Sequence, residues 1–199
     1  KPQRDVATSR PIRGQPPRRI NTGEVYLVTN RGERKATGSY YTPKYIVDYI
    51  VENTLGPLAD EAAQNVHDEL LPDVDNEIKK LEKTRREWEK ASSSPLVGEV
   101  GRGGKAQIAN LNKAIEEQKR RLLEPYLSLN VLDPAMGSGH FLVGAADFLS
   151  LAMATDPNLP HLEEMGDEDP QIFYKRLVVE RCLYGVDLNP LGVALAKLS

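Results

Sequence analysis

Residues 129–141 read LNVLDPAMGSGHF, and this stretch decides which fold the chain can adopt. A short apolar run ends at Asp133, and a loop of small residues then leads into a segment with helical spacing of apolar residues. Gly137 and Gly139 allow the main-chain amides of this loop to come close to a ligand, because glycine carries no Cβ atom. The pattern is typical of the strand, turn and helix that bind a nucleotide in an α/β fold.

The acid at the end of this first strand narrows the choice of ligand. The dinucleotide fingerprint requires a third glycine where this chain has Leu142, so NAD is disfavoured. Asp133 would repel the oxygens of a pyrophosphate, whereas it would pair well with the ammonium group of a cofactor that carries an amino acid. S-adenosylmethionine has such a group, and we expect it to be the cofactor.

A second apolar run also ends in an acid, because residues 182–190 read CLYGVDLNP. In a doubly wound sheet, an acid after the second strand accepts hydrogen bonds from the ribose hydroxyls, each worth roughly 1.5–3 kcal/mol. Asp187 is the candidate for this role. The distance in sequence from Asp133 exceeds the roughly 20 residues of a minimal nucleotide fold, so we expect an insertion at residues 154–170.

Three sequence elements together carry a resemblance to a known family. They are TGSYYTP at residues 37–43, DPAMGSGHF at residues 133–141 and GVDLNP at residues 185–190. In this order they resemble the N6-adenine DNA methyltransferases, above all the large methylases of single-chain restriction-modification enzymes and of BREX-type and DISARM-type phage-defence systems. The joint order of the three elements is far more specific than a single Gly-x-Gly loop.

The resemblance implies a Rossmann-like methyltransferase fold of the α/β class, an S-adenosylmethionine site and double-stranded DNA as substrate. In that family the first two elements line the cofactor site, the acid of the third holds the ribose, and the target adenine is extruded from the duplex. Subunits of a defence system are further implied partners. By position, the cofactor-binding roles fall on Tyr41, Thr42, Pro43, Asp133, Ala135, Gly137, Gly139 and Asp187.

The catalytic element of the family has no counterpart in these residues. It reads Asn, Asp or Ser, then Pro-Pro, then an aromatic residue, whereas this chain has only QPPR at residues 15–18 and NPLG at residues 189–192. We therefore predict no catalytic residue, and cofactor binding without methyl transfer. The chain begins without methionine and stops at Ser199 within a predicted helix, so we expect it to be the N-terminal fragment of a much larger protein.

Composition excludes several other classes of protein. The single cysteine, Cys182, excludes a disulfide framework and a cysteine-rich zinc site, and its apolar neighbours predict a buried structural thiol. The histidines and the acids of residues 163–169 lack the spacing of metal ligands, so we predict no metal site and a solvated loop. Without a signal peptide or a long apolar span, no membrane contact is expected and the cytoplasm is the expected location.

Charge is unevenly distributed along the chain. Residues 1–45 carry ten basic side chains against three acidic ones, a net charge of +7, whereas the whole chain carries −3. Arginine and proline dominate residues 1–21, which we expect to be a disordered arm. Such an arm suits salt-dependent contact with DNA phosphates, and a solvated leader without a partner is an equally good interpretation.

The remaining residues divide into three parts. In residues 22–58 we expect a strand at 24–29 and a helix that Thr42 caps, that Pro43 opens and that ends at Gly56-Pro57. Residues 59–124 combine sparse, helically spaced apolar residues with a glycine-rich break, which predicts an inserted antiparallel helical hairpin with solvated charged faces. Residues 125–199 would form the front part of the methyltransferase sheet.

Two alternatives to a DNA adenine methylase stay open. One is a non-catalytic docking module for nucleic acid or protein, built on a degenerate methylase fold. The other is a glutamine N5 or RNA adenine methylase, because those enzymes share the glycine loop. The basic arm and the long hairpin favour the DNA enzyme.

Overall fold

The computed structural model describes residues 42–92 and 100–199 of the chain. The chain divides into two units, residues 1–39 and 40–199, and every described residue belongs to the second. The predicted basic arm at residues 1–21, the predicted strand at 24–29 and the predicted site residue Tyr41 therefore lie outside the described residues.

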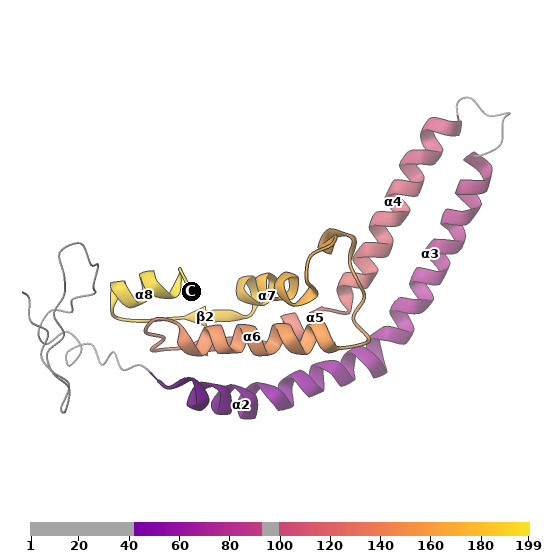
Figure 1. Ribbon diagram of the computed structural model, residues 1–199. Helices are drawn as coiled ribbons and strands as arrows, with labels where there is room; N and C mark the ends of the chain where they lie inside the picture. Colours follow the sequence, from indigo (N-terminus) through magenta and orange to yellow (C-terminus); the bar gives the residue numbers. More distant parts are fainter. Residues whose placement is uncertain (1–41, 93–99) are drawn as a thin grey trace, which may run out of the picture. The chain divides into compact units, whose positions relative to one another are not determined.

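Helices make up most of the described part of the second unit, which also contains two short strands (Figure 1). In chain order the elements are α2 (Lys44–Asn65), the π-helical turn η1 (Val66–Leu70), α3 (Leu71–Ser92), α4 (Val100–Arg121), α5 (Glu124–Leu127), β1 (Val131–Asp133), α6 (His140–Thr155), the 3-10 turn η2 (Glu163–Met165), α7 (Pro170–Arg181), β2 (Leu183–Gly185) and α8 (Pro190–Ala196).

The two strands are parallel neighbours, although residues 134–182 separate them in sequence. Val131 pairs with Leu183 and Asp133 with Gly185, so both carboxyl ends lie at the same edge. The chain between them passes through α6 and α7, and α6 contacts both strands. Because a parallel connection requires such a crossover, β1, α6, α7 and β2 form one strand–helix–strand unit. The larger Rossmann-like sheet stays a prediction, since the described residues contain only these two strands.

The helix after the Tyr-Thr-Pro element begins one residue later than predicted. Pro43 occupies the N-cap position with φ −58° and ψ 142°, and no side chain caps the helix there. These dihedral angles are extended, so the first helical residue is Lys44 and not Pro43. The prediction that Thr42 caps this helix is therefore wrong.

Pro57 does not end α2, contrary to the sequence-based expectation. A proline inside a helix costs about 3 kcal/mol, because it removes one hydrogen bond and crowds the preceding turn. Beyond Pro57, however, α2 and η1 bury Ala59, Ala62 and Val66 in the core. Pro57 itself is exposed, so the buried side of the helix continues past it. The free energy gained by burying these apolar side chains offsets the cost of Pro57 within the helix.

A π-helical turn joins α2 to α3, so that helical backbone runs without a break from Lys44 to Ser92. Its five residues, Val66–Leu70, directly precede the first turn of α3, where Pro72 lies. The ring of Pro72 would crowd the carbonyl of Asp68 in a regular α-helix, and a wider π turn at this point relieves that contact. At 1.5 Å per residue, the continuous helix is about 70 Å long.

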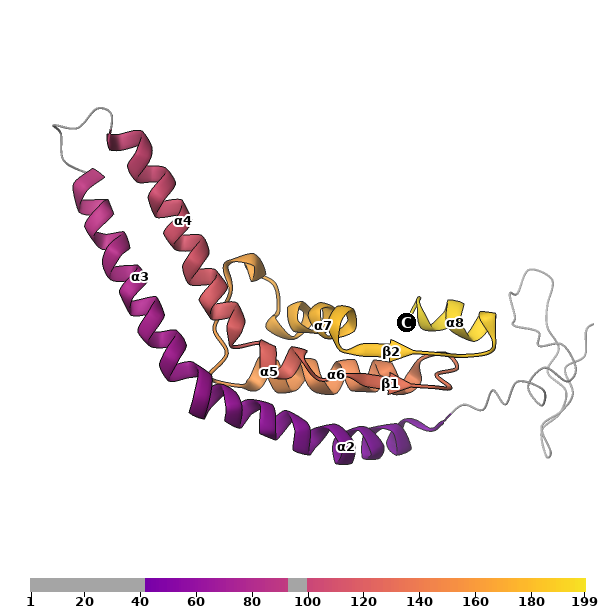
Figure 2. The ribbon, with the colours of Figure 1, turned by 180° about the vertical axis from the view of Figure 1, so that it is seen from behind.

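Helices α3 and α4 lie antiparallel beside each other (Figure 2). Arg121 at the end of α4 forms an ion pair of 3.2 Å with Asp73 at the start of α3. Midway along the pair, Arg85 Nη1 donates to Asn112 Oδ1 at 3.2 Å. The connecting residues 93–99 lie outside the described part of the chain.

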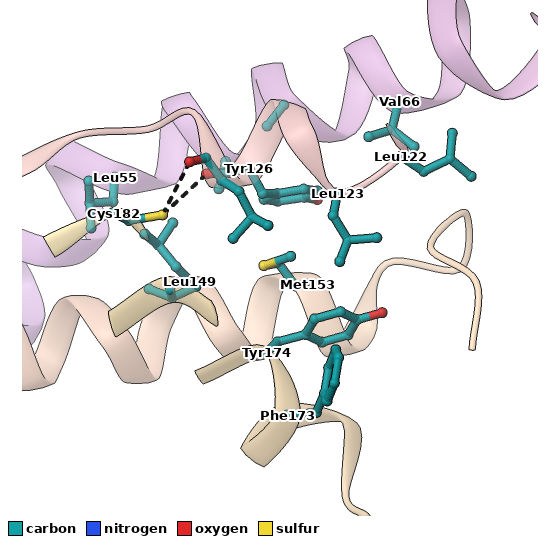
Figure 3. Close-up of a cluster of buried hydrophobic side chains, with 14 of the residues drawn as sticks. Leu55, Val66, Leu122, Leu123, Tyr126, Leu149, Met153, Phe173, Tyr174 and Cys182 are labelled. Atoms are coloured by element: carbon teal, nitrogen blue, oxygen red, sulfur yellow. Dashed lines mark hydrogen bonds between the residues drawn. The ribbon is translucent and has the colours of Figure 1, made fainter. Parts of the chain in front are cut away.

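A single apolar core joins α2, α5, α6 and α7 (Figure 3). Cys182 lies fully buried in this core, with its Sγ 3.7 Å from the carbonyl oxygens of both Tyr126 and Leu127. Burial raises the pKa of the Cys182 thiol, which keeps it protonated and unreactive. The prediction of a buried structural thiol is confirmed.

The segment between α6 and α7 contributes to the core as well as to the surface. Glu163 and Glu164 are exposed, as predicted for a solvated loop, but Leu162 and Met165 beside them are buried. Tyr126 Oη donates to Asp156 Oδ2 at 2.9 Å and fixes the start of this segment. The proposed insertion therefore includes part of the hydrophobic core.

The last two helices each begin with a side chain that caps the first turn. Asp169 accepts a hydrogen bond from the amide of Gln171 at the start of α7, and Asn189 accepts one from Leu191 at the start of α8. Helix α8 ends at Ala196, so the expectation that Ser199 lies within a helix is wrong. Among the described helices, none has the length and apolar character to cross a membrane.

The close approach of α2 to α6 can be tested at Gly144. A Cβ atom there would lie 2.9 Å from Val47 Cγ1, whereas a Cβ at Gly103 of α4 would meet no described atom within 4 Å. In an open helical position, Gly→Ala stabilises by roughly 0.5–1 kcal/mol, while overpacking a core costs about 1–3 kcal/mol. Urea unfolding should therefore show Gly103→Ala as the more stable variant by about 1–3 kcal/mol. Equal stabilisation by both substitutions would contradict this packing.

Candidate cofactor site

The carboxyl ends of β1 and β2 are joined by main-chain hydrogen bonds that continue beyond the strands. The amide of Val186 donates to the carbonyl of Asp133 at 2.9 Å, and the amide of Met136 donates to the carbonyl of Val186 at 3.0 Å. The loop that follows β1 is thereby attached to the residues that follow β2. The two acid-bearing elements of the sequence meet at one edge of the sheet.

Two glycines give the loop between β1 and α6 its path. Gly137 has φ +54° and Gly139 has φ +81°, both in the left-handed region that residues with a Cβ atom rarely adopt. The amide of Gly139 donates to the carbonyl of Met136 at 2.8 Å, which closes a tight turn, and Gly139 is the N-cap residue of α6. The backbone conformation therefore explains both glycines of the Gly-Ser-Gly sequence.

Asp187 fastens this loop to the second strand. Its Oδ1 accepts the amide of Asn189 at 2.6 Å, and its Oδ2 accepts the amide of Gly137 at 2.8 Å. These two main-chain donors, Asn189 first, hold the pKa of the Asp187 carboxyl below its usual value. A carboxylate offers about four lone-pair positions, so roughly two remain for other donors. Asp187 can thus hold the loop and still accept hydroxyl groups of a ligand.

Asp133 makes a similar contact with its own loop. Its Oδ1 accepts the amide of Ala135 at 3.0 Å, which turns the chain immediately after the strand. Asp133 is half-buried, whereas Pro134 and Ala135 are exposed. The structure therefore brings together five of the predicted site residues at one strand edge: Asp133, Ala135, Gly137, Gly139 and Asp187.

Helix α8 packs directly on the glycine loop, which the sequence analysis did not anticipate. A Cβ atom at Gly192 would lie 2.9 Å from the carbonyl oxygen of Gly137. One turn later, a Cβ at Gly139 would lie 3.0 Å from Cβ of Ala196. The small residues at positions 192 and 196, four apart on one helix face, were the available signal.

Gly185 is a further residue whose role the sequence analysis missed. It pairs with Asp133 across the sheet, and a Cβ there would collide with the sulfur of Met136 and lie 2.8 Å from Leu142 Cδ1. Glycine inside a strand often marks such a close approach. The absence of a side chain at Gly185 allows Met136 to fold over the strand end.

A pocket of about 320 Å³ runs along the edge of β1 that faces away from β2. Val131, Leu132 and Asp133 all line it. Because alternate residues of a strand point to opposite faces, a pocket that all three line lies along the edge of the strand and not on one face. The opposite wall comes from α2 and α6, and it is mostly apolar. Its lining is Ile50, Val51, Thr54, Leu55, Val131, Leu132, Asp133, Pro134, Phe141, Leu142 and Ala145.

The structure describes two of the three residues of the Tyr-Thr-Pro element. Tyr41 lies outside the described residues, Thr42 is half-buried and Pro43 is exposed. Helix α2 borders the pocket further along, from Ile50 onward, and neither Thr42 nor Pro43 lines it. The structure therefore leaves the predicted roles of these three residues as predictions.

The geometry of the strand ends fits a nucleoside that carries an amino acid. Within the described residues, no atom lies within 4 Å of a Cβ built on Gly137, so the space over the loop is open. Carboxylates stand at the ends of both strands, one half-buried and one with lone pairs to spare. In the same part of the chain, no group of three or more His, Cys, Asp or Glu side chains could hold a metal ion.

Comparison with known proteins gives one distant similarity. Over 178 residues, or 87% of the chain, the sequence is 26% identical to a protein of Methanocaldococcus jannaschii whose name is "Putative type II restriction enzyme and methyltransferase". The chain spans 12% of the length of this relative. No family model matches the chain, and no solved structure matches it either.

The contact between Asp187 and Gly137 can be followed by NMR as pH falls. We expect the Asp187 carboxyl and the Gly137 amide to titrate together, with a midpoint below the usual aspartate value. Since the folded-state pKa is lowered, this contact stabilises the fold above the unfolded-state pKa and is lost as pH falls through the folded-state pKa. Gly192→Ala should push the loop away and raise the midpoint toward the usual value, whereas Ala194→Ser on the exposed side of α8 should not. Independent titration of the two groups would contradict the contact.

Proposed function

We propose that this chain is the S-adenosylmethionine-binding part of a site-specific N6-adenine DNA methyltransferase of a restriction-modification or phage-defence system. The observation that carries the proposal is the pair of acids at adjacent parallel strand ends, with a glycine turn between them that Asp187 holds in place. The distant similarity to a protein named as a restriction enzyme and methyltransferase supports the same direction. A cytoplasmic location would follow from such a role.

Each polar group at the strand ends has a role in this proposal. Asp187 uses its remaining lone pairs to accept the ribose hydroxyls, and Asp133 pairs with the ammonium group of the amino-acid portion. Gly137 leaves open space for the nucleoside above the loop, whereas Gly139 turns the backbone into α6. Tyr41, Thr42 and Pro43 contribute to the same cofactor site in this proposal, as the Tyr-Thr-Pro element does in the methylases that the sequence resembles.

The proposal also includes a sheet larger than two strands. Leu132 and Tyr184 pair across the sheet and expose 62% and 50% of their surface, which is unusual because parallel sheets are normally covered on both faces. The apolar pocket beside β1 follows the free edge of that strand. We infer that a further parallel strand fills this pocket, as a Rossmann-like methyltransferase fold requires.

Methyl transfer to adenine requires groups that this sequence does not supply. An acceptor for the adenine amino group and an aromatic ring for stacking would hold the extruded base, and S-adenosylmethionine would supply the methyl group. The described residues bind and orient the cofactor, and the acceptor-Pro-Pro-aromatic element belongs to another part of the enzyme. Cofactor binding and chemistry are thus separable in this proposal.

Titration calorimetry with S-adenosylhomocysteine tests the binding role of Asp187. Asp187→Ala should weaken binding by about tenfold to a hundredfold, which corresponds to the loss of roughly 1.5–3 kcal/mol from charged hydrogen bonds. Asp169→Ala is a matched control, because Asp169 also accepts an amide two residues ahead at a helix start but lies at α7. Unchanged affinity in Asp187→Ala, or an equal loss in both variants, would remove Asp187 from the cofactor site.

A labelling experiment tests the reaction. The 199-residue chain and a longer form of the polypeptide that includes an acceptor-Pro-Pro-aromatic element are each incubated with adenine-containing duplex DNA and tritiated S-adenosylmethionine. We expect label on adenine N6 from the longer form alone. Label on cytosine, RNA or protein would contradict the proposed substrate, and N6 label from the 199-residue chain would contradict the separation of binding from chemistry.

A further inference from the structure

Helix α3 presents two unlike faces along its length. The helix packs against α4, and its apolar residues Val74, Ile78 and Leu81 are buried or half-buried along one face. The other carries four exposed basic residues, which we call the basic stripe: Lys79, Lys83, Arg86 and Lys90. At 3.6 residues per turn these four positions fall within an arc of about 60°, on the opposite side of the helix from the apolar residues.

The basic stripe is regular and open. Its spacings of four, three and four residues place neighbouring side chains about 5–6 Å apart, over a total length of about 16 Å. The long side chains border a shallow depression of about 410 Å³, which is lined by Lys79, Glu82, Lys83, Arg86, Glu87 and Lys90. Because one helix supplies the entire lining, the surface suits an extended partner and could not enclose a small molecule.

Ion pairing distinguishes two residues of the stripe, Lys79 and Lys83, from Lys119 and Arg121 of the same hairpin. Lys119 and Arg121 lie 2.6 and 3.2 Å from the carboxylates of Glu116 and Asp73. Within the described residues, neither Lys79 nor Lys83 forms an ion pair, and Arg86 approaches Glu82 only to 3.5 Å on the exposed surface. Exposed pairs at this spacing contribute little, about 0.3–0.5 kcal/mol, so Arg86 is easily released to another anion.

We propose that the basic stripe of α3 binds the phosphate backbone of duplex DNA. This inference rests on the proposed function, which supplies DNA as the partner. Duplex DNA carries about one negative charge per 1.7 Å of its axis, so a 16 Å stripe faces roughly nine phosphate charges. A straight helix that is packed against α4 holds its cations in a row before binding, and each phosphate contact releases counterions. The hairpin therefore adds sequence-independent affinity to the enzyme.

The test measures binding of a random-sequence 24-base-pair duplex by fluorescence anisotropy between 50 and 300 mM KCl. The variant Lys79→Gln/Lys83→Gln/Arg86→Gln removes three cations and retains good helix-forming residues. The slope of log K against log salt should become shallower by about 2.7, because each lost phosphate contact removes about 0.9. The matched control, Lys80→Gln/Lys105→Gln/Lys113→Gln, changes net charge equally on exposed positions outside the stripe and should leave the slope unchanged.

Equal slopes for the two triple variants, or no DNA binding by the unaltered chain, would overturn the inference. A loss of binding to polyglutamate without a change in the DNA slope would also overturn it, in favour of an acidic protein partner. Circular dichroism serves as the folding control, and both variants should retain their helices. Calorimetry with S-adenosylhomocysteine separates the two proposals: the stripe variant should keep cofactor affinity, and failure of the unaltered chain to bind the cofactor would overturn the proposed function alone.

Discussion

The hydrogen bond from the Gly137 amide to Asp187 Oδ2 is the contact on which the candidate site depends. It joins the loop after β1 to the residues after β2, which are 50 positions apart in the chain. The same carboxylate accepts the amide of Asn189 and so directs the chain into α8, whose Gly192 packs on the loop in return. A single acid thus fixes both the shape of the glycine turn and the position of the helix that supports it, while part of its hydrogen-bonding capacity stays available.

The sequence predicts the strand ends well because their chemistry is local. Asp133 and Asp187 each end a short apolar run, and the small residues after Asp133 predict a tight loop. The structure adds the left-handed backbone that requires Gly137 and Gly139. The capped starts of α7 and α8 are local signals of the same kind. By contrast, Gly185 and Gly192 matter only because a sulfur atom and a carbonyl from distant segments approach them. Such contacts depend on tertiary packing: the spacing of Gly192 and Ala196 marks a face of small residues on α8, but it does not show which distant segment packs there.

The helical half of the chain shows where local rules fail. Proline is a reliable local signal for the end of a helix, yet Pro57 lies inside α2 and Pro72 follows a π-helical turn within continuous helix. In each case the apolar face continues into the core, through Ala59 and Ala62 after the first proline and Val74 after the second. Burial summed over several residues exceeds the local cost of one missing hydrogen bond.

The central claim is that a nucleoside cofactor binds across the carboxyl ends of β1 and β2. The most direct measurement is an NMR map of main-chain amide shifts in the 199-residue chain as S-adenosylhomocysteine is added. The account predicts that the largest shifts fall on residues 133–139 and 187–192, with saturation at one common affinity. Shifts confined to the hairpin of α3 and α4, or the absence of any saturable shift at the glycine loop, would contradict it.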